Sequence, residues 1–246
     1  MQQRETRPDS RELVRLDGFH AVKHALRFGA VIDRIVAVDR DEALALARQL
    51  APDVAEALAE RVEAVEPSEL EHVPYSGVVA WARRPRATSN DVGRNAPSVW
   101  LEDPRDLGNL GACIRVAAAA EAAGAFVSGD RDPWAPPAVR GSAGLHFAIP
   151  VVHGPPDLEA RTLVAVAVDG DRLDPAAVPD NAVLAFGTER HGLSEAVREQ
   201  ASLTLALPMR VGVSSLNLAT AVSAVLFAWR LRRAYQTSPA PETARA

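Results

Sequence analysis

Several features that would assign this sequence to a class directly are missing or scarce. Among 246 residues there is one cysteine, Cys113, so a disulfide framework or a cysteine-based metal cluster cannot form within one chain. No apolar run approaches the roughly 20 residues that a membrane-spanning helix needs. The first residues, MQQRETRPDSREL, are too polar for a secretory signal. We therefore expect a protein of the reducing cytoplasm that makes no membrane contact.

Excess positive charge is also missing. The 27 Lys and Arg residues are outnumbered by 32 Asp and Glu residues, which gives a formal net charge of −5, and neither half of the chain is basic. This balance argues against a protein that coats nucleic acid non-specifically. Lys23 is the single lysine. A coding bias explains the preference for arginine, although arginine also suits two-pronged contacts with phosphate.

The common nucleotide, hydrolase and metal motifs are absent as well. No G-x-G-x-x-G follows a predicted strand, and there is no G-x-x-x-x-G-K-[ST] and no H-E-x-x-H. Gly141 and Gly144 stand one residue too close for a G-x-S-x-G nucleophile elbow. A serine hydrolase or a metal site is therefore not expected.

Helix and strand patterns alternate in two blocks. Residues 1–15 are polar and are expected to form a disordered tail, and residues 16–82 form a small α/β domain. In this domain the pattern predicts helices at 18–29 and 42–50, a helical turn at 68–71, and strands at 35–38, 62–65 and 77–81. Residues 83–97 have little apolar content and indicate a linker.

The linker holds the densest group of positive charges in the chain. Its cations are Arg83, Arg84, Arg86 and Arg94. An ordinary solvated linker explains them, and so does a strap that contacts phosphate between two domains.

The second block, residues 98–235, predicts an α/β fold with an open, mostly parallel sheet. Its strands are apolar without interruption, as in parallel sheets buried on both faces. They are expected at 99–101, 125–127, 163–168, 183–186 and 203–207, with helices at 110–122, 195–200 and 215–233. Residues 236–246 contain two prolines and are expected to form a disordered tail.

Three loops at predicted strand ends have unusual compositions, and ligands bind at such ends in open α/β sheets. The first, residues 102–115, places Asn109 between two glycines at a helix start and Arg115 within an alanine-rich helix. A capped helix with a surface arginine explains it equally well. The second, residues 186–194, contains glycines, a glutamate and His191, which is either a general base or an ordinary exposed histidine.

The third loop, residues 207–221, leads into the longest predicted helix. Ser214 or Ser215 is expected to cap that helix. Capping does not explain Asn217, which the pattern places just inside the helix, where a better helix former is typical.

Together the three loops resemble the three motifs of the SpoU/TrmH family of RNA ribose 2′-O-methyltransferases, in the SPOUT superfamily. The motifs match at residues 103–115, 186–194, and 207–209 with 213–221, and the segment 140–150 is similar to the family's connecting segment. Residues 16–82 resemble the family's small substrate-binding domain, which is similar to ribosomal protein L30e. The nearest type is the 23S rRNA guanosine 2′-O-methyltransferase.

The resemblance implies a deep trefoil knot in the C-terminal domain, S-adenosylmethionine (SAM) bound in that knot, and a homodimer with the active site near its interface. By position, the SAM contacts are Gly187, Leu207, Met209 and Leu216. Arg115 matches the catalytic arginine, and Asn109, Glu189, Ser215 and Asn217 match its polar surroundings. We expect RNA contacts from Arg83, Arg84, Arg86, Arg94 and Ser142.

Arg190 and His191 depart from the family pattern, which has small or acidic residues at these positions. The function that the resemblance implies is SAM-dependent methylation of a ribose 2′-hydroxyl in structured RNA, with 23S rRNA ahead of tRNA. The alternatives are a tRNA enzyme, an RNA- or ribosome-binding protein that has lost catalysis, and a methyltransferase acting on a small molecule. Because arginine stays protonated at physiological pH, Arg115 would stabilise an alkoxide or hold a phosphate more readily than accept a proton.

Overall fold

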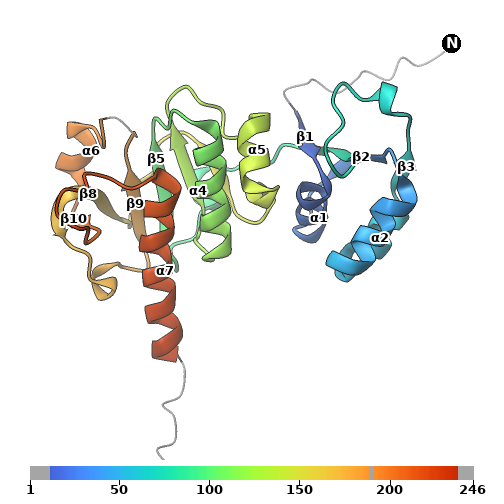
Figure 1. The fold of residues 1–246 in the computed structure, drawn as a ribbon. Helices are drawn as coiled ribbons and strands as arrows, with labels where there is room; N and C mark the ends of the chain where they lie inside the picture. The colour runs from blue at the N-terminus through green and yellow to red at the C-terminus, as the bar shows by residue number, and fades with distance from the viewer. Residues whose placement is uncertain (1–11, 189–190, 238–246) are drawn as a thin grey trace, which may run out of the picture.

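The computed structural model describes residues 12–188 and 191–237, which form two sheets flanked by helices (Figure 1). The tails were expected at 1–15 and 236–246, and their outer parts, residues 1–11 and 238–246, lie outside the described residues. Their inner parts are ordered instead, because residues 13–15 belong to a strand and residues 236–237 to the last helix. No helix in the described part of the chain is both long and apolar enough to cross a bilayer.

The N-terminal sheet has four strands in the order β1-β4-β2-β3, in which only the pair β2 and β3 is parallel. Its strands are β1 (Leu13–Asp17), β2 (Ile32–Ala37), β3 (Val62–Ala64) and β4 (Val78–Arg83). The helices are α1 (Phe19–Arg27), α2 (Arg40–Leu50), α3 (Ala55–Ala59) and the 3₁₀ turns η1 (Pro52–Val54) and η2 (Pro67–Glu69). Strand β1 was not predicted, and the domain was expected to begin at residue 16, so ordered structure begins earlier than expected. The strand forms because Val14 and Leu16 are buried against β4 while the residues between them are not.

The second sheet has six strands in the order β10-β8-β9-β5-β6-β7, and every neighbouring pair is parallel. The strands are β5 (Ser98–Glu102), β6 (Ala125–Ser128), β7 (Val151–His153), β8 (Thr162–Arg172), β9 (Ala182–Phe186) and β10 (Leu203–Ala206). The helices are α4 (Leu107–Ala119), α5 (Pro136–Ser142), α6 (Glu195–Gln200), α7 (Leu218–Thr237) and the 3₁₀ turns η3 (Ser89–Asp91), η4 (Leu145–Phe147) and η5 (Pro175–Ala177). The mostly parallel α/β sheet is confirmed.

Hydrophobic cores cover both faces of this sheet. Leu101 and Leu184 pack into the core that contains α4, α5 and α7. The residues next to them in sequence, Trp100 and Val183, belong to a separate core on the opposite side that includes Val197 of α6. Burial on both sides explains the uninterrupted apolar runs of these strands.

The segment 83–97 is fixed to the second sheet along part of its length. Val92 is buried in the core that contains Phe126, and the Arg161 guanidinium donates to the backbone oxygens of Val92 and Gly93 at 2.5 and 2.9 Å. The segment also contains the 3₁₀ turn η3, which Thr88 caps. Although residues 83–97 contain few apolar residues, part of this linker is therefore packed against the second domain.

The two sheets meet where α1 and β1 contact α5 and η4 (Figure 1). At this junction the backbone oxygen of Ala143 lies 2.7 Å from Nδ1 of His24. Gly144 approaches α1 so closely that a Cβ atom there would lie 2.5 Å from the Ala21 oxygen. Only glycine fits this approach, and its φ of +78° also favours glycine. The backbones of the two domains are therefore in direct contact at this point.

Arg84 supports the same junction. Its guanidinium forms two bonds with the Asp132 carboxylate, at 2.8 and 2.9 Å, and lies 6.0 Å from the centre of the Trp134 ring. Because Asp132 and Trp134 lie in the segment that leads into α5, Arg84 attaches the linker to the second domain. This role differs from the phosphate contact expected for it.

Ser142 is also not placed as expected, because it is fully buried and has no surface to offer RNA. It belongs to a hydrogen-bonded chain beneath the junction. Nε2 of the buried His146 lies 2.7 Å from the Pro133 carbonyl, which can only accept, so Nε2 carries the proton. Nδ1 then accepts from Oγ of Ser142 at 2.6 Å. The expected RNA contact of Ser142 is therefore wrong.

The burial of His146 predicts that the protein loses stability in acid. Burial lowers the pKa of His146 from 6.5 to about 4. As the pH falls below 6.5, the unfolded chain binds a proton at His146 that the folded chain excludes. The free energy of unfolding therefore falls, by roughly 3 kcal/mol once the pH reaches about 4.

Urea unfolding between pH 4 and 8 measures this effect. His146→Gln should be less stable than the wild type at pH 7.5 and should show a shallower decline toward pH 4. His72→Gln, at an exposed histidine, is the matched control and should follow the wild-type curve. Equal pH slopes for wild type and His146→Gln would contradict the assignment.

Candidate active site

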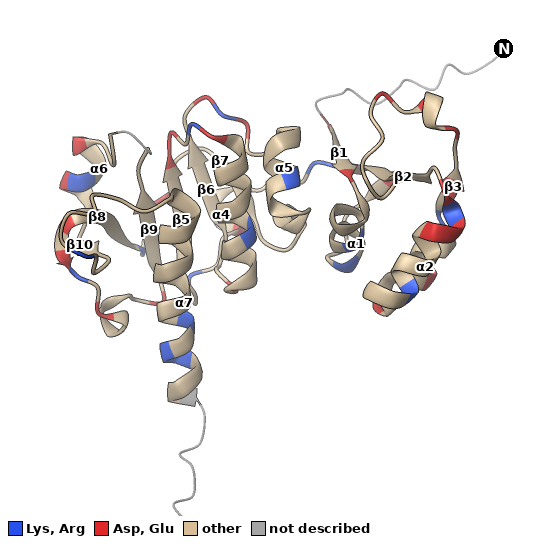
Figure 2. Ribbon diagram, in the orientation of Figure 1, with Lys and Arg blue, Asp and Glu red and all other residues tan. Residues whose placement is uncertain are grey.

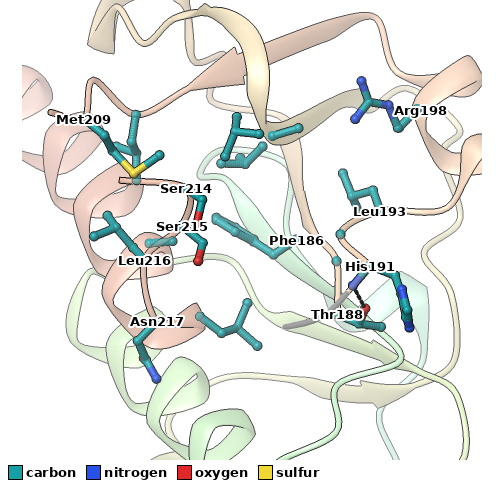
Figure 3. A pocket seen from close by; sticks show the side chains of 18 residues that line it. Phe186, Thr188, His191, Leu193, Arg198, Met209, Ser214, Ser215, Leu216 and Asn217 are labelled. Carbon is teal, nitrogen blue, oxygen red and sulfur yellow. Dashed lines mark hydrogen bonds between the residues drawn. The ribbon is translucent and has the colours of Figure 1, made fainter. Parts of the chain in front are cut away.

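A cleft of about 790 Å³ opens beside residues 166–168 of β8 and at the ends of β9 and β10 (Figure 3). The four residues expected to contact SAM, namely Gly187, Leu207, Met209 and Leu216, all line this cleft. So do Ser215 and Asn217 from the expected catalytic set. The structure therefore brings the second and third motifs together around one opening.

The second motif forms a tight turn at one wall of the cleft. The backbones of Thr188 and Gly192 pair through two hydrogen bonds of 3.0 Å, and the His191 N–H donates to Oγ1 of Thr188 at 3.0 Å. A Cβ atom at Gly187 would lie 1.9 Å from the Gly192 carbonyl carbon. Glycine is therefore required for this turn to close. Glu189 and Arg190, which were expected to matter here, lie outside the described residues.

Glu102, which was not predicted to be a site residue, binds Ser194 at the C-terminal end of the second motif. It ends β5, and its carboxylate accepts from the Ser194 backbone N–H at 2.8 Å and from the Ser194 hydroxyl at 2.6 Å. Ser194 in turn caps α6 by accepting from the Val197 N–H. A glutamate directly after an apolar strand and before the first motif is the signal that could have found it.

The third motif forms an exposed loop along the opposite wall. Residues 211–217 are all exposed, and α7 begins only at Leu218. The expected cap at Ser214 or Ser215 is therefore wrong. The cap is Asn217, whose Oδ1 accepts from the backbone N–H groups of Ala219 and Thr220 at 2.9 and 3.4 Å. An asparagine is favoured at a helix start, which explains its presence.

Asn217 also joins the third motif to the first. Its Nδ2 donates to Oδ1 of Asn109 at 3.0 Å. Asn109 lies in the first turn of α4, which Asp106 caps by accepting the Asn109 N–H at 2.7 Å. One asparagine therefore fixes the start of α7, the rim of the cleft and the start of α4 relative to one another.

Arg115 lies farther along α4, outside the residues that line the cleft. Six residues of helix separate it from Asn109, which is about 9 Å along the axis. Its side chain is exposed, and the other exposed positions on that stripe, Gly108 and Ala119, are small. Arg115 is thus exposed on the helix that Asn109 joins to the rim of the cleft.

The expected RNA contacts in the linker differ from one another. Arg83 pairs with Asp33 at 3.1 Å and Arg86 pairs with Glu12 at 3.0 Å, both at the surface. Arg94 is exposed. Surface ion pairs contribute about 0–1 kcal/mol, so a phosphate can replace their carboxylates.

The geometry suits a ligand of moderate size with both apolar and polar parts. Phe186, Leu193 and Leu216 supply apolar surface, and Figure 3 shows the Ser214 and Ser215 side chains beside Phe186. The glycine turn at 187 allows close approach to backbone groups. An adenosyl group with a charged tail has this mixture of surfaces, so the residues present fit SAM.

Comparisons with known proteins identify the same part of the chain. The model of the SpoU rRNA methylase family matches residues 96–227. A 23S rRNA (uridine(2479)-2′-O)-methyltransferase of Streptomyces viridochromogenes is 35% identical over 159 residues, which are 58% of this chain and 55% of the relative. A 23S rRNA (guanosine-2′-O-)-methyltransferase RlmB of Pseudomonas syringae is 32% identical over 56% of this chain and 60% of that protein. The chain thus spans little more than half the length of these relatives.

Solved structures match over a larger share. The SpoU methyltransferase AviRb of Streptomyces viridochromogenes is 25% identical and superposes with a TM-score of 0.75 over 92% of this chain and 91% of the other. An AdoMet-bound rRNA methyltransferase of Sinorhizobium meliloti is 26% identical, with a TM-score of 0.71 over 91% and 89%. Because the family match covers the six-stranded sheet, the cleft and all three motifs, the chain belongs to the SpoU rRNA methylase family.

Proposed function

We propose that this protein transfers a methyl group from SAM to a ribose 2′-hydroxyl in structured RNA, with 23S rRNA as the substrate. The observation that carries the proposal is the cleft in which the second and third motifs meet, joined to the first motif by the bond between Asn217 and Asn109. The relatives named as 23S rRNA 2′-O-methyltransferases support rRNA ahead of tRNA.

In this proposal Gly187, Leu207, Met209 and Leu216 hold SAM, which supplies an electrophilic methyl group when bound. The Gly187 turn and the loop 211–217 form the walls, and their backbone groups are available for hydrogen bonds. Ser215 lies in the same wall and extends the polar surface. The resemblance to the family supports a trefoil knot in this region.

Arg115 acts on the substrate side. A guanidinium stays protonated and has five N–H donors, so it can contact a backbone phosphate and stabilise negative charge that develops on the 2′-oxygen. Asn109 and Asn217 order the rim between the cleft and α4. Glu189, expected in the same polar group, remains part of the proposal on its motif position alone. Aligning the hydroxyl with the methyl group supplies much of the acceleration.

The N-terminal domain is proposed to bind the folded RNA, as in L30e-like domains, and the linker cations Arg83, Arg86 and Arg94 are proposed to enlarge the RNA-binding surface.

We further propose that the protein acts in the cytoplasm as a homodimer. Phe227, Leu231 and Tyr235 lie at helical spacing on α7 and are 38%, 54% and 80% exposed. Such an apolar stripe is typical of a surface that another chain covers.

Transfer of radiolabelled methyl groups from SAM to deproteinised rRNA and to total tRNA tests the function. We expect label in 23S rRNA, and nuclease mapping should find one 2′-O-methylated nucleoside. Label confined to tRNA would identify a tRNA enzyme instead. No label in either pool would overturn the proposal. In that case calorimetric titration with SAM distinguishes a binding protein without catalysis, which has lost the cofactor site, from a small-molecule enzyme, which retains it.

A further inference from the structure

Helix α1 presents a row of cationic and titratable side chains on one face. His20, Lys23, His24 and Arg27 recur at the i, i+3, i+4 and i+7 spacing that places residues on one side of a helix. The buried residues of α1, namely Phe19, Ala21, Val22 and Ala25, pack into the core. Lys23, the only lysine in the chain, is therefore on a face directed away from the strands of its own domain.

The domain junction holds this face in a fixed position relative to the second domain. His24 contacts the Ala143 oxygen, and Gly144 abuts the backbone of Ala21. Behind this contact, α5 packs tightly on α4, because a Cβ atom at Gly111 would lie 2.1 Å from the Ala138 oxygen. The positions of α1 and α4 are thus linked through α5 and the residues after it, by close backbone contacts at Gly144 and Gly111 and by the His24 side chain. Figure 2 shows blue segments of α1 and α4 on the two sides of α5.

Arg115 of α4 is near enough to affect the side chains of α1. Burial lowers the pKa of His20, and the positive charges of Lys23 and Arg115 lower it further. Burial also lowers the pKa of Lys23, together with the charges of Arg27 and Arg115, against the opposing effect of Asp53. The positive charge of Arg115 in the second domain therefore acts on His20 and Lys23 in the first.

Counter-charges within the described residues satisfy only part of this group. Arg27 is engaged by Asp53 through two hydrogen bonds of 2.6 and 2.7 Å. Lys23 and Arg115 form no salt bridge within the part of the chain that the structure describes, although Asp53, the partner of Arg27, also acts on the charge of Lys23. Two cations near each other favour the binding of an anion, because an opposite charge relieves their repulsion.

We propose that Lys23 and Arg115, with His20 beside them, bind one phosphodiester of the RNA substrate close to the ribose that receives the methyl group. The inference rests on the proposed function and adds to it a substrate-binding residue from the N-terminal domain. The exposed stripe of α4 carries only small residues next to Arg115, namely Gly108 and Ala119, so an RNA backbone can approach the helix there. Lys23 thereby connects substrate binding by one domain to the catalytic arginine of the other.

The test compares Lys23→Met with a matched control, Arg48→Met, which removes an exposed positive charge from α2. Binding of deproteinised 23S rRNA is measured by filter retention across a KCl series, with S-adenosylhomocysteine present. For Lys23→Met we expect about tenfold weaker binding at low salt. The slope of log K against log[KCl] should become shallower by about 0.7–0.9, as expected for loss of one phosphate contact. Arg48→Met should match the wild type, and Lys23→Arg should restore most of the affinity.

Steady-state kinetics and two controls decide the interpretation. Lys23→Met should raise the KM for rRNA about tenfold while kcat stays within twofold, with SAM affinity and melting temperature unchanged. Identical RNA affinity and salt slope for Lys23→Met and Arg48→Met would overturn the inference and leave the proposed function intact, provided that the wild type methylates rRNA. Weakened SAM binding or a lowered melting temperature would show a structural role and would also overturn it. A wild type that transfers no methyl group to RNA overturns the proposed function and this inference together.

Discussion

Gly187→Ala should weaken SAM binding at least a hundredfold and reduce methyl transfer accordingly. The added Cβ atom would lie 1.9 Å from the Gly192 carbonyl carbon and 2.1 Å from the Leu193 nitrogen, both of which are backbone atoms. A backbone overlap of this size cannot be relieved by rotating a side chain, so the turn between Thr188 and Gly192 must open. Because this turn forms a wall of the cleft, its displacement removes the surface on which the cofactor would rest. Calorimetric titration with SAM measures the effect.

Gly93→Ala is the matched control for this substitution. Its Cβ atom would meet the Asn95 side-chain oxygen at 3.2 Å, a contact that a small rotation relieves, and the position is outside the cleft. This variant should bind SAM like the wild type. Far-UV circular dichroism should show that Gly187→Ala keeps its helices and strands, since the turn is at the rim of the sheet. SAM affinity of Gly187→Ala within threefold of the wild type would show that the cofactor does not bind in this cleft.

Arg115→Ala should lower kcat for rRNA methylation at least a hundredfold and leave SAM binding unchanged. The loss of a donor that stabilises developing negative charge typically costs a factor of 10² to 10³. SAM affinity should persist because Arg115 is outside the residues that line the cleft. The fold should tolerate the change, since Arg115 is exposed on α4 and alanine is the strongest helix former.

Single-turnover measurements with saturating rRNA isolate the chemical step in Arg115→Ala. Arg131→Ala removes another exposed arginine of the same domain and should retain wild-type rates. Lost SAM binding in Arg115→Ala would mean that this residue supports the cofactor site rather than the substrate. Arg115→Ala and Lys23→Met should also differ from each other, because the first is expected to lower kcat and the second to raise KM.

The regular parts of the fold could be predicted because local patterns determine them. Helix α6 has the predicted bounds, and the apolar runs at β5, β6 and β9 mark buried parallel strands. Elements that depend on partners far away in sequence were less accessible. Strand β8 was predicted to end at residue 168 but continues to Arg172, because β10 pairs with Asp171 and Arg172 after a shift in register.

Helix α5 illustrates a second limit. Its sequence, PPAVRGS, has two prolines and a glycine and does not resemble a helix former. The helix exists because Gly141 and Gly111 allow α5 and α4 to approach at backbone distance. A glycine that weakens a helix in isolation thus permits the packing that stabilises it. The cleft was also predictable only in part. The spacing of the motifs indicated which loops lie together, but the hydrogen bond between Asn217 and Asn109 could not be predicted, because it depends on how the two helices are placed in the fold.

Every nucleotide of a ribosomal RNA carries the same 2′-hydroxyl, so chemistry at the acceptor atom cannot select one among thousands. The contact of Gly144 with Ala21 suggests how the target nucleotide is selected, namely by its distance from the phosphate bound at α1. With a phosphate bound at Lys23, the packing of α1 against α5 and η4 sets the distance from that phosphate to the cleft. An RNA would qualify only when its fold sets the target ribose at that span from the phosphate held at α1. Inserting one nucleotide between the two points should then shift the methylated position by one rather than abolish methylation.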